Sequence, residues 1–165
     1  MDPLISTKLL PARSRPRLVA RPRLSQRLDS ELGRRLTLVS ASAGFGKTTL
    51  LSGWWERRQR SERYAAWLSL DEGDNDPARL LRYLVAAIAL AVDAQEFGEG
   101  VLAALSSPEP PRTEALLGAL VNEMTHLRRG LNLVLDDYHA INSATVHNLL
   151  SRLLERLPDD THAQC

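Results

Sequence analysis

The sequence predicts an α/β fold in which a parallel sheet carries helices on both faces, giving three layers. Short apolar runs of strand length alternate with longer segments of helical periodicity. These short apolar runs are consistent with strands buried on both faces. A loop of small residues between the first run and the following helix indicates a ligand site at one sheet edge. The 165 residues suffice for one such domain.

The first 20 residues form a basic leader, which we expect to be largely irregular because proline and arginine dominate it. Residues 1–35 carry nine basic and three acidic side chains, a net charge of +6, against −5 for the rest. Such a leader either docks on the acidic body as a solvated arm or steers phosphates or nucleic acid toward it. It shows no recognition-helix or zinc pattern, which disfavours DNA reading by this segment alone.

The predicted elements then follow in alternation. A short helix over 21–32 precedes a strand over 36–40, the small-residue loop and a helix over 47–58. Further strands are predicted over 64–70 and 131–135. Asp76 and Pro77 are typical of a helix start, and further helices are expected over 113–128 and 143–157. Glycines and prolines break the pattern over 97–111.

The small-residue loop, residues 41–49, is called the glycine loop below. It matches the P-loop pattern G-x-x-x-x-G-K-[ST], with Ala41 in place of the first glycine. Small residues let backbone N–H groups wrap around phosphate, and the helix that follows adds its positive dipole end. Lys47 is expected to neutralise the β- and γ-phosphates, and Thr48 to ligate Mg²⁺. The predicted nucleotide-binding residues here are Ala43, Gly44, Phe45, Gly46, Lys47, Thr48 and Thr49.

Two aspartates follow the apolar run over 131–135. A buried strand would hold Asp136 rigidly at its carboxyl end, as a Walker B carboxylate that supports the Mg²⁺ shell. For Asp137 two interpretations stand: a general base that polarises water, or a turn residue after the strand.

Other polar residues carry weaker signals. The acidic stretch over 71–76 lacks the twelve-position calcium pattern, so we expect a solvated cap-and-turn cluster near the ligand edge. His139 and His147 have no partners at metal-ligand spacing, which favours surface or packing roles. Cys165, the only cysteine, offers neither a disulfide nor a metal cluster and is typical of a reducing cytoplasm.

Three stretches together resemble one family. Residues 38–50 (LVSASAGFGKTTL), 67–75 (WLSLDEGDN) and 133–139 (LVLDDYH) are similar to the N-terminal NTPase domain of MalT-type regulators. These are large ATP-dependent transcription activators of the LuxR class, within the signal-transduction (STAND) ATPases. The resemblance covers essentially the whole chain, and the LDEGDN stretch is more specific than a P-loop alone.

The resemblance implies a cytoplasmic switch with no membrane contact, which rests with ADP and is activated with ATP and Mg²⁺. In full-length relatives an inducer, self-association and promoter DNA complete the activated state, through regions absent from this sequence. The leader lies near the adenine in such proteins, which makes Val19 and Arg21 candidate neighbours of the base. Hydrolysis resets the switch there.

The sequence departs from the family at its end. Relatives continue into a strand that carries a γ-phosphate-sensing arginine, whereas we expect 159–165 to be a tail after an incomplete domain over 21–158. The chain is thus expected to be a fragment or a truncated reading frame, with slow or no hydrolysis. In the additional-strand class of P-loop ATPases that next strand lies between the P-loop and Walker B strands. Its expected absence predicts a gap in the sheet and a marginal, aggregation-prone fold.

The sequence also allows two other functions. A free-standing ATPase or phosphotransferase would need γ-phosphate-sensing arginines, for which Arg112, Arg128 and Arg129 are loosely placed candidates. A degenerate interaction module would not need an intact Lys47, Thr48 or Asp136. Calorimetry followed by a turnover assay separates the three.

Overall fold

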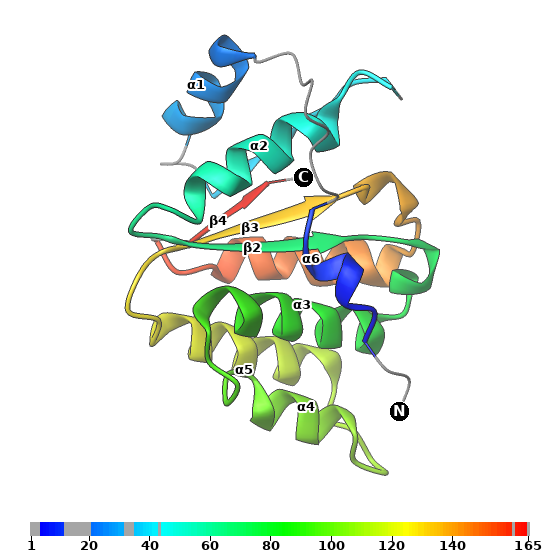
Figure 1. Ribbon diagram of the computed structural model, residues 1–165. Helices are drawn as coiled ribbons and strands as arrows, with labels where there is room; N and C mark the ends of the chain where they lie inside the picture. Colours follow the sequence, from blue (N-terminus) through cyan, green and yellow to red (C-terminus); the bar gives the residue numbers. More distant parts are fainter. Residues whose placement is uncertain (1–3, 12–20, 32–34, 43, 160, 165) are drawn as a thin grey trace.

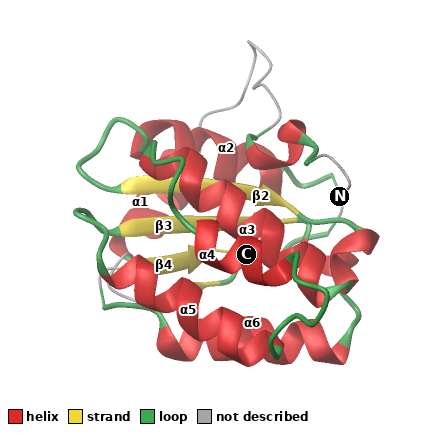
Figure 2. Ribbon diagram, turned by 90° about the horizontal axis from the view of Figure 1, so that it is seen from below, coloured by secondary structure: helices red, strands yellow, loops and turns green. Residues whose placement is uncertain are grey.

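Helices cover both faces of a four-stranded parallel sheet (Figures 1 and 2). The computed structural model describes residues 4–11, 21–31, 35–42, 44–159 and 161–164. Its strands, in the order β1-β4-β3-β2 across the sheet, are β1 Leu36–Thr37, β4 Thr161–Gln164, β3 Leu131–Asp136 and β2 Tyr64–Ser69. The three-layer α/β prediction is confirmed.

The expected gap in the sheet is wrong. Residues 161–164 form β4, which pairs in parallel with β1 on one side and β3 on the other, so that Ala163 lies opposite both Leu36 and Leu133. The sequence hid this strand because Thr161, His162 and Gln164 are polar and the segment contains no apolar run. All four residues are nevertheless buried, because helices cover both faces of the sheet. The edges of β1 and β3 that were expected to be open are therefore paired.

The helices divide between the two faces. On one face lie α1 (Pro22–Ser30) and α2 (Lys47–Arg58), as Figure 1 shows. On the other lie α3 (Pro77–Val92), α4 (Glu99–Leu105), α5 (Thr113–Thr125) and α6 (Ala144–Arg156). Three 3-10 turns complete the elements: η1 Ser6–Leu9, η2 Glu72–Asn75 and η3 Tyr138–Ala140.

Two apolar cores follow from this division. The larger joins the sheet to α3, α4, α5 and α6, and the smaller joins it to α1 and α2. In the smaller core Trp54 is fully buried, and its indole Nε1 donates to Asp29 of α1 at 2.9 Å. Trp55 donates to the carbonyl of Ala65 in β2 at 2.9 Å. Trp54 thus joins α2 to α1, and Trp55 joins α2 to the sheet. No helix in the described part of the chain is long and apolar enough to cross a bilayer.

Several boundaries differ from the sequence predictions. β1 ends at Thr37 rather than Ser40, and Thr37 lies opposite Gln164 of β4. Leu32, the last residue of the helix predicted over 21–32, lies outside the described residues. The predicted breaks over 97–111 concealed α4, which begins after Gly98. Gly98 has φ 75°, and a Cβ at this position would lie 2.2 Å from Val85, so the glycine permits both the turn and the close approach.

Candidate functional site

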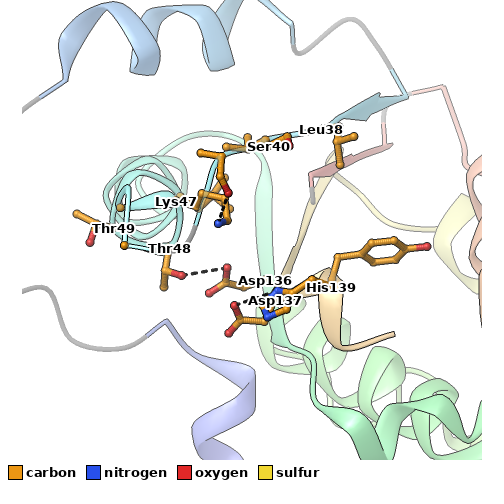
Figure 3. Close-up of a pocket in the computed structure, with 14 residues that line it drawn as sticks. Leu38, Ser40, Lys47, Thr48, Thr49, Asp136, Asp137 and His139 are labelled. Atoms are coloured by element: carbon orange, nitrogen blue, oxygen red, sulfur yellow. Dashed lines mark hydrogen bonds and ion pairs between the residues drawn. The ribbon is translucent and has the colours of Figure 1, made fainter. Parts of the chain in front are cut away.

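A cavity of about 700 Å³ opens at the carboxyl edge of the sheet, where β1, β3 and the start of α2 converge (Figure 3). It is lined by residues 38–41 after β1, by Gly44, 46–49 and Leu51 of the glycine loop and α2, and by 136–139 at the end of β3 and beyond it. In a parallel sheet this edge is where loops from separate strands meet. The two motifs that the sequence predicted as one site therefore share one cavity.

The glycine loop takes its shape from two left-handed residues. Gly44 has φ 81° and Gly46 has φ 76°, conformations that side chains other than glycine adopt only with strain. Gly46 is the N-cap of α2, and its carbonyl accepts the first helical bond from Leu50 N at 2.9 Å. The unpaired amides of the first helical turn and the positive dipole end consequently begin at the loop.

Lys47 is held by the loop that precedes it. Its Nζ donates to the carbonyl of Ala41 at 2.7 Å and to that of Ser42 at 3.3 Å. In Figure 3 the ammonium lies on the cavity side of the loop. Phe45, at the tip of the loop, is 63% exposed, and its carbonyl accepts a 3.0 Å hydrogen bond from Arg21. Arg21, which the resemblance suggested as a neighbour of the base, therefore contacts the glycine loop directly.

Thr48 and Asp136 meet across the cavity (Figure 3). The Thr48 hydroxyl donates to Asp136 Oδ1 at 3.2 Å. Asp136 is the last residue of β3 and only 4% exposed. Burial raises the pKa of its carboxyl, and the neighbouring charge of Asp137 adds to this, against the opposing effects of Thr48 and Lys47. The site thus holds a carboxylate that a nearby cation would stabilise.

Asp137 adopts a left-handed conformation, with φ 57°, as the chain turns from β3 into η3. Such a conformation is uncommon for a residue other than glycine and is concentrated at functional sites. Its carboxylate is half exposed at the cavity and lies 3.8 Å from His139 Nδ1. Asp137 thus lies in a turn after the strand, a placement that is compatible with either interpretation, and its general-base role stays a prediction.

The remaining predicted residues are placed less centrally. Thr49 is exposed and points away from the two aspartates in Figure 3. Val19 and Ala43 lie outside the described residues. Tyr138 and His139 also line the cavity next to Asp137. Neither was predicted for the site, and His139 was expected to have a surface or packing role. Their adjacency to the predicted carboxylates was the signal that could have identified them.

The acidic stretch after β2 is a cap-and-turn cluster, as predicted. The Asp71 carboxylate accepts from Gly73 N at 2.8 Å, and Asp76 caps α3 by accepting from Arg79 N at 2.7 Å. The cluster is not fully solvated, however, because Asp74 is completely buried and bound to Lys8 Nζ at 2.5 Å. Within the described ranges, no three His, Cys, Asp or Glu side chains converge as a metal-binding group.

Lys8 comes from the leader, in η1. Besides Asp74 it contacts Asp71 Oδ2 at 2.9 Å, and its Nζ lies 4.3 Å from the centre of the Tyr83 ring. At this residue the basic leader docks on the acidic body, one of the two roles considered for it. Lys8 is only 7% exposed, so the contact is buried and does not belong to a solvated arm.

Comparison with known proteins relates the chain to a part of longer transcriptional regulators. No protein-family model matches it. It is 36% identical over 141 residues to the HTH-type transcriptional regulator MalT of Cronobacter sakazakii. It is 35% identical over 142 residues to MalT of Serratia proteamaculans and 34% to that of Klebsiella pneumoniae. These matches cover 86% of this chain but only 15% of each relative. The chain is therefore a MalT-related region, homologous to a part of these transcriptional regulators.

Proposed function

We propose that this chain is a nucleotide switch module that binds ATP or ADP with Mg²⁺. The observation that carries the proposal is the convergence of Lys47, Thr48 and Asp136 on one cavity at the start of α2. Phosphate would bind at the glycine loop, where first-turn amides, the helix dipole and the Lys47 charge act on the same point. Release of Lys47 Nζ from the carbonyls of Ala41 and Ser42 would accompany phosphate binding.

The oxygen donors at the cavity suit Mg²⁺. This ion keeps several waters and takes one or two carboxylates, so the Thr48 hydroxyl and the Asp136 carboxylate form a fitting donor pair. The buried, incompletely compensated charge of Asp136 favours a cation at this position. When bound, Mg²⁺ supplies charge neutralisation to the phosphate oxygens. Asp137 would contact the same region from its left-handed turn.

The base would lie toward α1. A second cavity, of about 590 Å³, adjoins the first and shares Leu38, Val39 and Ser40 with it. Its other walls mix apolar and polar side chains. Leu24 and Leu28 of α1 and Leu50 of α2 could pack against a planar base, while Arg27, Glu31 and Thr37 could bond to its edge or to the ribose. Arg21 contacts the glycine loop between α1 and α2, consistent with the expected place of the leader beside the base.

The regulatory half of the proposal rests on the MalT relatives, of which this chain spans about one seventh. We infer a cytoplasmic switch whose nucleotide state is read by other parts of a full-length regulator. An inducer, self-association and promoter DNA would act through those parts. Two rivals remain to be separated by experiment: a free-standing ATPase or phosphotransferase, and an interaction module without nucleotide function.

Calorimetry with ATP and ADP, each with Mg²⁺ and with EDTA, tests the proposal. Lys47→Ala removes a charge-assisted contact of about 1.5–3 kcal/mol, so ATP affinity should fall about tenfold to a hundredfold. Arg60→Ala is the matched control, because it removes one exposed positive charge just beyond the other end of α2. Equal ATP affinity in wild type and Lys47→Ala would contradict the glycine-loop assignment. If the wild type bound neither ATP nor ADP, the interaction module would be favoured.

A further inference from the structure

Asn75 joins two loops that are 65 residues or more apart in the chain. It ends η2, in the turn after β2, and its carboxamide reaches the segment between β3 and α6. Its Nδ2 donates to Ala140 O at 3.0 Å, and its Oδ1 accepts from the amides of Asn142 at 2.8 Å and Ser143 at 2.7 Å. Nδ2 also donates to Glu72 O at 3.0 Å, within its own turn.

The pattern of these bonds requires a carboxamide. Two donors are directed at carbonyls and one oxygen accepts from two amides, so both functions of the side chain are satisfied. An aspartate at this position would keep the acceptor but lose both donors. An alanine would leave Ala140 O and the amides of Asn142 and Ser143 without this partner.

The segment that Asn75 holds is the one that shapes the acidic side of the site. It starts at Asp137, whose carbonyl accepts from Ala140 N at 2.9 Å, and it ends at Ser143, the N-cap of α6. The β3 end is fixed as well, because Leu70 N donates to Asp136 O at 2.9 Å. Sheet pairing therefore fixes Asp136, whereas the path of Asp137 and η3 depends on the Asn75 bonds at their far end.

The turn that carries Asn75 is itself held by hydrogen bonds. Its turn is closed by a capping box in which Asp71 accepts from Gly73 N and Asp74 Oδ2 accepts from Asp71 N at 2.8 Å. The buried Lys8 ammonium binds both of these carboxylates. The carboxamide thus projects from a rigid turn, which is what a side chain needs in order to position another loop.

We propose that Asn75 is a positioning residue of the nucleotide site: it holds residues 137–143 so that Asp137 stays at the cavity, beside the Asp136 carboxylate. This inference rests on the proposed function. It assigns Asn75 to the Mg²⁺ side of the site and not to the phosphate loop. Loss of the carboxamide should therefore weaken ATP binding in the presence of Mg²⁺ and leave ATP binding in EDTA unchanged.

The test compares Asn75→Ala with Asn142→Ala. Asn142 is of the same residue type and lies in the held segment, but its side chain is exposed and only its backbone amide bonds to Asn75. Calorimetry gives the ratio of ATP affinity with Mg²⁺ to that in EDTA. Amide hydrogen exchange is followed in peptides covering 137–143, 41–49 and α3. Asn75→Asp, which keeps the acceptor, serves as the milder variant if Asn75→Ala does not fold.

For Asn75→Ala the affinity ratio should fall about threefold to tenfold, the effect of one or two lost hydrogen bonds. Exchange should accelerate in 137–143 while 41–49 and α3 keep wild-type rates, and Asn75→Asp should lie between. Unchanged exchange in 137–143, an unchanged affinity ratio, or equal acceleration in all three peptides would overturn the proposal. Absence of ATP binding in the wild type would instead overturn the proposed function, and the exchange of 137–143 would still decide the role of Asn75 in holding that segment.

Discussion

At the scale of single residues, Asp136 is the costliest group in the site. Its carboxylate is buried, Thr48 is the side chain that donates to it among the described residues, and Asp137 adds a like charge. Without a cation this arrangement destabilises the folded protein, because a buried charge is compensated only in part. Asp136 is also the residue that would bind Mg²⁺. The stability that its buried charge costs the folded protein would therefore be recovered when Mg²⁺ binds.

Asp136→Asn tests this balance. The amide keeps an oxygen to accept from Thr48 and removes the buried charge, so the free energy of unfolding without Mg²⁺ should rise by about 1–3 kcal/mol. Since the pKa of Asp136 is raised in the folded state, wild-type stability should also gain as pH falls through that pKa toward 3.8. The variant should lack this gain and lose the Mg²⁺ dependence of ATP binding. Urea unfolding at several pH values measures the first two, and a less stable variant would contradict the argument.

At the scale of elements, η1 shows how a short segment is anchored by one charged side chain. Lys8 is almost fully buried, between Asp71, Asp74 and the Tyr83 ring. Arg79 adds a second cation, with Nε 3.3 Å from Asp74 Oδ1. Removing one partner of a buried carboxylate strongly lowers the stability of the folded protein. This cluster therefore fixes the leader more firmly than an exposed ion pair would.

Lys8→Met should lower the free energy of unfolding by about 3 kcal/mol, the low end of the range for breaking a buried pair, because Arg79 stays near Asp74. Arg35→Met is the control, since its ion pair with Asp159 and its hydrogen bond to Glu155 O are both exposed and should together contribute only about 1 kcal/mol. Chemical denaturation measures both variants. Equal losses in the two would show that burial does not strengthen the Lys8 contacts.

The same cluster predicts a pH dependence. Partial burial alone would raise the pKa of Asp71, but the hydrogen bond and charge of Lys8, with Gly73 N and Arg79, lower it overall from 3.8. A carboxyl whose folded pKa is lowered contributes stability that is present above 3.8 and is lost as pH falls through the lower folded value. Acid unfolding of the wild type should therefore steepen below about pH 4, and this component should be smaller in Lys8→Met.

At the scale of the whole molecule, the parts that the sequence predicted are those with local causes. The turn of the glycine loop follows from Gly44 and Gly46, and the start of α3 from Asp76 and Pro77, because each needs only its neighbours in the chain. β4 was missed because only burial between two helical layers makes its polar residues a strand. The hydrogen bonds of Asn75 were missed because they form only in the folded chain. No spacing in the sequence pairs Asn75 with Ser143.

Turnover is also a property of the whole molecule. We expect very slow or no ATP hydrolysis by this chain even where binding is retained, because no arginine lines the main cavity among the described residues. An arginine at the transferred phosphate is worth about a thousandfold or more in rate. A phosphate-release assay should therefore remain near background with Mg²⁺ and ATP. About one turnover per second, abolished by Asp137→Asn, would favour the free-standing ATPase.

The position of β4 has a consequence for how the molecule assembles. Among the described strands β1 pairs only with β4, which lies more than a hundred residues later in the chain. β2 and β3 can pair earlier, over six matched positions from Tyr64 opposite Leu131 to Ser69 opposite Asp136. Pairing between such distant segments is slow, because a long loop must close before any contact compensates its entropy. During synthesis at the ribosome, the strand before the glycine loop therefore has no place in the sheet until residues 161–164 have emerged.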